Sequence, residues 1–295
     1  MKQGLNRLLF ALPLFMGTGH LYANDILTVV KDTSKVTHVQ QIRNATVKIS
    51  YADTTFLIDP MFAKKGVYQG FPDTYRSELR NPLVDLPFKA ETILQGVDAV
   101  IITHTHLDHW DDAAQTVIPK DMPLFVQNAT DQKLIRSQGF KDVRVLTRTV
   151  FEGVSLTKTG GQHGTDKMYS IPQLKAALGE AMGVVFTAPG HETVYVAGDT
   201  IWRPEVDQTI QNFRPEVIVL NTGNALVNGF EESIIMGKED TYHATQKAPY
   251  AQVIAVHMDA INHMSITRAQ LTDYVKEKRI QDKVLIPIDG ETLSF

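Results

Sequence analysis

Residues 102–112 read ITHTHLDHWDD and bring three of the ten histidines of this 295-residue chain together with three aspartates. Four of these residues, His104, His106, Asp108 and His109, form the pattern H-x-H-x-D-H. Imidazole nitrogens and carboxylate oxygens are the ligands that zinc and similar divalent metals take in proteins. A solvated loop is the structural alternative, but so dense a pattern favours a metal site.

The residues on either side place this cluster in a loop. Residues 97–103 (VDAVIIT) form an apolar run apart from Asp98 near its start, which predicts a buried strand. Residues 111–118 (DDAAQTVI) predict a helix with its acidic end first. Side chains two positions apart in extended backbone share a face, so His104 and His106 can reach one ion. Asp108 and His109 lie where the chain turns into the helix, so their side chains can point past that ion.

The rest of the chain predicts one mature domain of mixed α and β structure, residues 24–295. Residues 60–90 are rich in proline, glycine and aromatics and predict a long functional loop. We find no repeat, low-complexity tract or linker. The predicted strands are 26–30, 44–50, 54–60, 123–127, 143–147, 154–159, a hairpin over 183–200 that turns at Pro189 and Gly190, 216–221 and 251–257; the predicted helices are 129–138, 240–248 and 267–279.

Residues 1–23 have the pattern of a secretory signal peptide: two positive charges, an apolar stretch at residues 8–16 and a small residue, Ala23, at the expected cleavage site. The alternatives are a buried helix and a membrane anchor, but the apolar run is too short to span a bilayer and contains Pro13. We therefore expect an exported protein, periplasmic or secreted, whose mature form is not anchored in a membrane.

The composition limits which classes of partner and which types of metal ligand are possible. Loss of Lys2 and Arg7 with the signal changes the formal net charge from −4 to −6, and a negative chain does not favour nucleic acid. The chain has no cysteine, so a metal must be held by nitrogen and oxygen. We expect a small-molecule substrate, and the composition leaves the oligomeric state open.

A metal needs about four ligands, so the cluster should have distant partners at other strand ends. His163 in GGQHG, Asp199 in AGDT and His257 after QVIAV each follow a predicted strand. The remaining histidines fit less well: His20 leaves with the signal, and we predict that His38, His191 and His243 lie at the surface. His263 follows six residues after His257 in a predicted loop. It is predicted to donate a hydrogen bond to substrate or to lie at the surface, with neither favoured.

The chain resembles the metallo-β-lactamase-fold hydrolases in four motifs taken together. These are H-x-H-x-D-H after an apolar strand, a glycine-flanked histidine, G-D-T and a strand-terminal histidine. The resemblance runs from about Ala45 to the C-terminus, includes FLIDP at residues 56–60, and is nearest the branch similar to ascorbate-phosphate lactonases. It implies an α/β fold, a four-layer αββα sandwich, with a dinuclear metal site along one edge of the sheets.

Carried over to this chain, the resemblance implies two divalent ions, zinc first and manganese or iron as alternatives, sharing a hydroxide. Asp108 is expected to pass a proton to the leaving group, and Asp59 to orient a histidine from behind; for Asp59, a polar strand end before Pro60 is an equal alternative. The implied ligands are His104, His106 and His163 for one ion, Asp108, His109 and His257 for the other, and Asp199 between them.

The leading hypothesis is therefore a secreted hydrolase of a small lactone, ester, amide or phosphodiester. The alternatives are an iron-dependent oxidoreductase acting on persulfides or oxygen, and a non-catalytic binding protein, which the complete ligand set disfavours. The aromatics between Phe62 and Phe88, with Trp110 and Trp202, are predicted either to wall a substrate pocket or to belong to the core. Residues 169–183 are predicted to form a lid.

Overall fold

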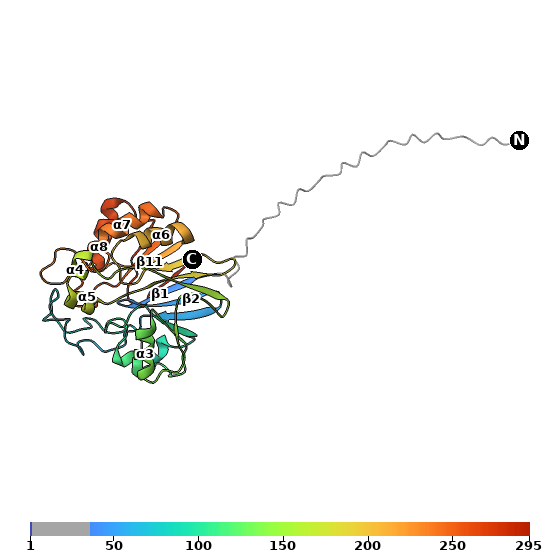
Figure 1. Cartoon of the computed structure of the whole chain (residues 1–295). Coiled ribbons are helices and arrows are strands. Elements are labelled where there is room, and N and C mark those ends of the chain that lie inside the picture. The colour runs from blue at the N-terminus through green and yellow to red at the C-terminus, as the bar shows by residue number, and fades with distance from the viewer. Residues whose placement is uncertain (2–35) are drawn as a thin grey trace. The chain divides into compact units, whose positions relative to one another are not determined.

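The computed structural model describes Met1 and residues 36–295, so the predicted signal peptide and the predicted strand at residues 26–30 lie outside the described residues. Two seven-stranded sheets form the centre of the fold (Figure 1). In spatial order, the first sheet contains β14 (Thr292–Ser294), β1 (His38–Arg43), β2 (Thr46–Tyr51), β3 (Thr54–Ile58), β4 (Ala99–Ile102), β5 (Leu124–Val126) and β6 (Val143–Val145). The second contains β13 (Val284–Leu285), β12 (Gln252–Val256), β11 (Val217–Asn221), β10 (Val194–Val196), β9 (Gly183–Thr187), β8 (Val154–Thr159) and β7 (Arg148–Phe151).

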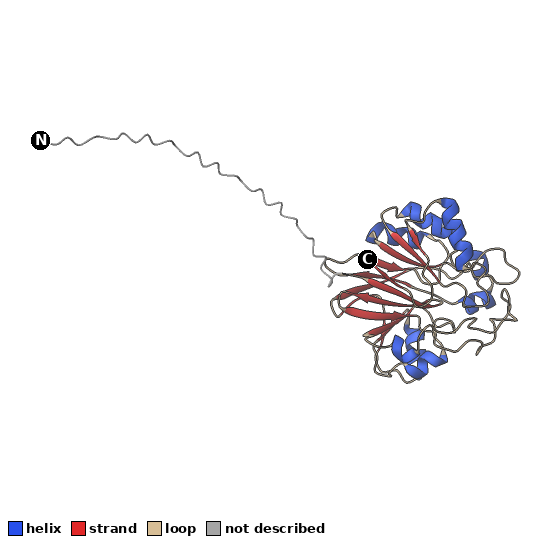
Figure 2. Cartoon of the chain, turned by 180° about the vertical axis from the view of Figure 1, so that it is seen from behind, coloured by secondary structure: helices blue, strands red, loops and turns tan. Residues whose placement is uncertain are grey.

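Helices cover the outer faces of the two sheets, as Figure 2 shows. The helices against the first sheet are α1 (Ala90–Ile93), α2 (Asp112–Val117) and α3 (Ala129–Ser137); those against the second are α6 (Pro204–Phe213), α7 (Lys238–Lys247) and α8 (Arg268–Lys278). Two short helices, α4 (Asp166–Tyr169) and α5 (Pro172–Leu178), follow β8. The predicted αββα sandwich is confirmed.

Three apolar layers hold the sandwich together. The central layer lies between the sheets and includes Ile49, Phe56 and Phe186, all fully buried. Each outer layer joins one sheet to its helices, because the strands are apolar on both faces and each helix presents one apolar stripe. Residues 36–295 contain no helix that combines the length and the apolar character needed to cross a membrane.

Strand direction brings the predicted ligands to one edge. β8 and β10 are each antiparallel to β9, and β10, β11, β12 and β13 are mutually parallel, so five strands of the second sheet end at the same side. In the first sheet β3, β4, β5 and β6 are parallel. Ligand-bearing loops of open α/β sheets follow the carboxyl ends of such strands, which is where the chain places its histidines.

Several elements differ from the prediction. The strands β1, β7, β13 and β14 and the helices α1, α4, α5 and α6 were not predicted. Helix α6 begins with Pro204 and lacks a side-chain cap, so its start carries no capping signal. The predicted strand at 143–147 ends at Val145, and the predicted cap of α8 is present, with Thr267 and Gln270 forming a capping box.

Candidate metal centre

The loop after β4 is shaped by its own hydrogen bonds. The amides of His109 and Trp110 both donate to the carbonyl oxygen of His106, at 2.9 and 2.8 Å, and this turn directs the chain into α2. The side chain of Asp111 accepts a bond from the amide of Ala114 at 2.7 Å and thereby caps that helix. The predicted cluster therefore lies between a buried strand and a capped helix, with its side chains directed toward the other sheet.

His104, His106 and His163 form the first group of facing side chains. The Nε2 atom of His104 lies 3.0 Å from the Nδ1 atom of His106. The loop that carries His163 is tied to the segment after Asp199, since the amide of Gln162 donates to the Oγ1 atom of Thr200 at 2.9 Å. Ligand atoms of all three histidines lie within 4.8 Å of one another, which allows one ion to bind all three.

Asp108, His109 and His257 form the second group, again within 4.8 Å. The Nε2 atoms of His109 and His257 face each other at 3.2 Å. The Oδ2 atom of Asp108 lies 3.5 Å from the Nε2 atom of His257. Asn44, in the turn between β1 and β2, joins the group: its side chain donates to the carbonyl of Asp108 at 2.8 Å, and its own carbonyl accepts from the amide of His257 at 3.1 Å.

Asp199 lies between the two groups. Its Oδ2 atom is 3.5 Å from His163 Nε2 and 3.9 Å from His104 Nε2 in the first group. The same oxygen is 3.1 Å from His109 Nε2 and 3.5 Å from His257 Nε2 in the second. The amide of Asn221 donates to the other oxygen, Oδ1, at 2.6 Å. Asp199 can therefore join two ions through one oxygen while Asn221 holds the other.

These residues fit a pair of divalent cations. The seven side chains are buried apart from that of His106, and neither ring nitrogen of His163 has a hydrogen-bond partner within the described residues. Burial lowers the pKa of His163 to about 3 and lowers the pKa of His104 well below its ordinary value, so both rings are neutral near pH 7, the form that binds metal. Unpartnered ring nitrogens facing one another in a buried site are costly unless a cation lies between them.

The buried carboxylates around His109 are stabilised by a positive charge close to them. Burial alone would lower the pKa of His109, but the carboxylates of Asp199, Asp108 and Asp59 raise it well above its ordinary value. Burial would likewise raise the pKa of Asp199, but the His109 and His257 rings hold it well below its usual range. A metal cation at the ligand-facing nitrogen supplies the charge that these buried carboxylates otherwise draw from a proton.

Asp59 lies behind His109, at the end of β3. Its Oδ2 atom accepts a bond from the Nδ1 atom of His109 at 2.8 Å, and its two oxygens also accept from the amide and the hydroxyl of Thr103, both at 2.7 Å. This contact makes the Nδ1 atom of His109 the protonated one and leaves Nε2 free to face the metal site. A carboxylate behind a ligand histidine fixes the ring and strengthens its binding.

Replacing Asp59 with asparagine is therefore expected to weaken metal affinity about 10–100-fold without removing a ligand. Chelator competition on the purified protein measures this. Asp98→Asn is the matched control, because the Asp98 carboxylate also accepts a backbone amide, that of Thr55 at 2.8 Å, but contacts no histidine. Equal affinity in the Asp59→Asn variant and the wild type would show that Asp59 is only a polar strand end.

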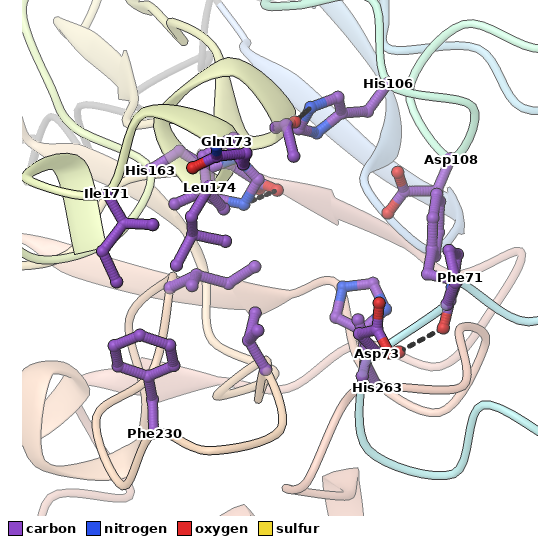
Figure 3. A pocket seen from close by; sticks show the side chains of 17 residues that line it. Phe71, Asp73, His106, Asp108, His163, Ile171, Gln173, Leu174, Phe230 and His263 are labelled. Atoms are coloured by element: carbon purple, nitrogen blue, oxygen red, sulfur yellow. Dashed lines mark hydrogen bonds and ion pairs between the residues drawn. The ribbon is translucent and has the colours of Figure 1, made fainter.

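An apolar pocket of about 490 Å³ opens onto these groups (Figure 3). His106, Asp108, His163 and Asp199 line its inner end. Three segments form its walls: Phe71 and Pro72 from the loop after β3; Ile171, Leu174, Ala177 and Leu178 from α5 and its start; and Val227, Phe230 and Ile234 from the segment before α7. The predicted lid thus contributes one wall, and the long loop contributes another.

Most of the aromatics considered for the pocket belong elsewhere. Phe62 and Trp110 pack in the outer layer of the first sheet, and Trp202 packs against the layer of the second sheet. Phe88 is exposed. Among the aromatics named from the sequence, the pocket contains Phe71 alone, because the loop after β3 directs its other rings toward core or solvent.

The histidines outside the two groups differ among themselves. His38 and His243 are exposed, as predicted, whereas His191 is half-buried against the ring of Tyr51 at 5.4 Å. His263 is 7% exposed and lines the pocket, so it is not a surface residue. The sequence analysis missed Asn44 and Asn221; the polar end of the apolar strand β11 is a signal that could have identified Asn221.

Comparison with known proteins agrees with this fold and with a metal-dependent hydrolase. The family model described as the beta-lactamase superfamily domain matches residues 54–258. The UPF0173 protein YddR of Bacillus subtilis (strain 168) is 47% identical over 88% of this chain and its own full length. The crystal structure of a possible metal-dependent hydrolase from Veillonella parvula DSM 2008 has a TM-score of 0.87 and 48% identity over 88% of this chain and all of that one. An isothiocyanate hydrolase from Delia radicum gut bacteria has a TM-score of 0.85 and 49% identity over 88% of this chain and 99% of that one.

Proposed function

We propose a substrate for this chain, which belongs to the beta-lactamase superfamily and is a metal-dependent hydrolase of the metallo-β-lactamase fold. The proposal is that it uses two divalent ions to hydrolyse small, uncharged, largely apolar isothiocyanates. The overall reaction is R–N=C=S + H₂O → R–NH₂ + O=C=S. The observation that carries the proposal is the joining of two ligand groups by Asp199 at the inner end of an apolar pocket.

The pocket supports an uncharged substrate. Its walls are aliphatic and aromatic, and its lining residues include neither lysine nor arginine. A carboxylate or sulfonate on the part of the substrate away from the metals would lie among apolar side chains, near Asp73, without a cation to pair with. Burying an unpaired charge is strongly unfavourable, whereas a benzyl or alkyl group gains free energy there.

The similarity to the isothiocyanate hydrolase selects the reacting group. That protein shares 49% of aligned residues with this chain over almost its whole length, and the isothiocyanate group has an electrophilic carbon that water can attack. When bound, two divalent ions would supply Lewis-acid polarisation and lower the pKa of water enough for attack near neutral pH. The apolar walls exclude bulk water from the rest of the substrate.

The chain's own residues then orient the reaction. Asp199 and the two ligand groups would hold the ions at the inner end of the pocket, and their position determines where the reacting end of the substrate lies. Burial opposes ionisation of Asp108, yet the His109 and His257 rings lower its pKa, so its carboxylate is ionised and can accept the proton of the attacking water. Asp108 can return that proton to the nitrogen, which gives R–NH–C(=S)–OH. As the carbon–nitrogen bond breaks, the remaining hydroxyl proton passes to the same nitrogen with Asp108 as its carrier, and R–NH₂ and O=C=S leave.

A substrate panel tests the proposal. We expect the zinc-loaded protein to hydrolyse benzyl isothiocyanate, releasing benzylamine and carbonyl sulfide, with kcat/KM at least about 100-fold above that for bis(p-nitrophenyl) phosphate or benzylpenicillin, given the cost of an unpaired buried charge. Activity with redox-inactive zinc would also separate hydrolysis from the iron-dependent alternative. A preference for the phosphodiester, or for an uncharged lactone of similar size, would contradict the assignment.

A further inference from the structure

His263 occupies the pocket without belonging to either ligand group. It lines the pocket, and Figure 3 shows its ring on the same side as Asp108, opposite the side chains of Ile171 and Leu174. It is 7% exposed, and its Nδ1 atom is buried without a hydrogen-bond partner in residues 36–295. Buried polar atoms are rarely left unpaired, and those that are often have a role in binding or catalysis. With Nδ1 enclosed, Nε2 is the nitrogen that a molecule in the pocket can reach.

The backbone around His263 is held rigidly by its neighbour Asn262. The side-chain oxygen of Asn262 accepts from the amide of Phe71 at 3.0 Å, and its nitrogen donates to the carbonyl of Tyr75 at 2.9 Å. The carbonyl of His263 itself accepts from the amide of Leu226 at 3.0 Å. These bonds tie His263 to two of the three segments that wall the pocket, so its ring stands in a defined place before substrate arrives.

The ring orientation is fixed as well. Phe71 packs edge-on against His263, with ring centroids 5.1 Å apart and an angle of 83° between the planes. Because Phe71 is also bonded to Asn262, one loop sets both the wall of the pocket and the direction of the imidazole. A donor that is already oriented loses little entropy when it binds a developing charge.

The other hydrogen-bond donors around the pocket either belong to a metal group, already donate to a protein atom, or lie far from the reacting end of the substrate. The rings of His106 and His163 belong to the first metal group. The hydroxyl of Thr74 donates to the carbonyl of Phe71 at 2.7 Å. Gln173 lies on α5, on the far side of the pocket from Asp108 (Figure 3). His263 is thus the pocket donor that remains available beside the metal groups.

We propose that His263 is a catalytic residue that donates an Nε2–H hydrogen bond to the substrate atom that becomes negatively charged when water adds. This rests on the proposed function and deepens it. As the new carbon–oxygen bond forms, the electron pair of the C=N bond moves onto nitrogen, and His263 stabilises that charge without losing its proton. The proton from water goes to Asp108, so atoms and charge balance without a further reactant.

The test compares His263→Phe, which keeps an aromatic ring but has no donor, with His263→Gln, which restores an N–H at a similar reach. With benzyl isothiocyanate and zinc-loaded protein, we expect His263→Phe to lower kcat about 100-fold, the effect of losing one oriented donor, with both ions retained. His263→Gln should recover about tenfold of this loss, because its amide restores part of the donor's contribution. His38→Gln is the control, since His38 is exposed.

A binding measurement gives a readout that does not depend on turnover. N-Benzylthiourea carries the same apolar group and a thiocarbonyl acceptor. Calorimetry should show that it binds His263→Phe about tenfold more weakly than it binds the wild type or His263→Gln, because one hydrogen bond is lost. Equal thiourea affinity, unchanged kcat in His263→Phe, or loss of one ion would each overturn the inference. A wild type that binds the thiourea but does not hydrolyse the isothiocyanate would contradict the proposed function alone.

Discussion

Replacing Asp199 with alanine is expected to reduce metal content from about two ions per chain to less than one and to lower kcat by on the order of 10³ or more, because metal activation contributes several kcal/mol. The physical reason is the position of one atom, Oδ2, which lies within 4 Å of a ring nitrogen from His163, His104, His109 and His257. No other side-chain oxygen in the described residues is shared in this way between the two groups. Its loss weakens both metal positions at once.

Elemental analysis and thermal unfolding measure the result together. Wild-type protein should unfold at a higher temperature with zinc than after chelation, because a ligand that binds only the folded state stabilises it. The Asp199→Ala variant should show almost no such difference. Asp121→Ala, at an exposed aspartate, is the control and should keep the metal, the activity and the shift. A variant that retains two ions would exclude Asp199 as the bridge.

Replacing His257 with alanine is expected to remove one ion rather than two. His257 belongs to the second group with Asp108 and His109, whereas the three histidines of the first group remain intact. We therefore expect a metal content near one ion per chain and a kcat lowered about 10²–10³-fold, as when one of two cooperating metals is lost. His163→Ala should give the same stoichiometry through loss of the other ion.

Comparing His257 with His263 distinguishes a metal ligand from a residue that donates a hydrogen bond to substrate. Although His263 lies only six residues after His257, its ring lines the pocket and is absent from both ligand groups. Metal titration of His257→Ala and His263→Ala, with His243→Ala as a surface control, distinguishes the two roles. Retention of two ions in His257→Ala together with loss of one ion in His263→Ala would show that the roles are reversed.

The local sequence determined the part of the site that lies on one continuous segment. H-x-H-x-D-H follows a strand that is apolar at every position and precedes a helix with an aspartate cap, and each of these signals spans only a few residues. Side-chain direction in such a segment follows from backbone geometry alone. The local geometry therefore agreed with the division that the family resemblance implied, with His104 and His106 on one face and Asp108 and His109 directed past them.

The distant ligands were indicated by strand ends but selected by the fold. His163, Asp199 and His257 follow three different strands, β8, β10 and β12, and meet only because these strands run in the same direction in one sheet. Sequence pattern does not specify strand order. Strand-end positions therefore nominated His163, Asp199 and His257, and the resemblance to a known family was needed to divide them between two ions.

Only the tertiary structure decided which groups stand behind and around the ligands. Asn221 reaches Asp199 across neighbouring strands, and the carbonyl of Ala177 lies 2.9 Å from the Nε2 atom of His106. The pocket likewise combines segments more than 150 residues apart, Phe71 and Val227 among them. Such contacts depend on packing between elements distant in sequence, and neither periodicity nor local spacing carries that information. His263 is buried in the pocket for the same reason: the bonds of Asn262 to the loop after β3 place it there.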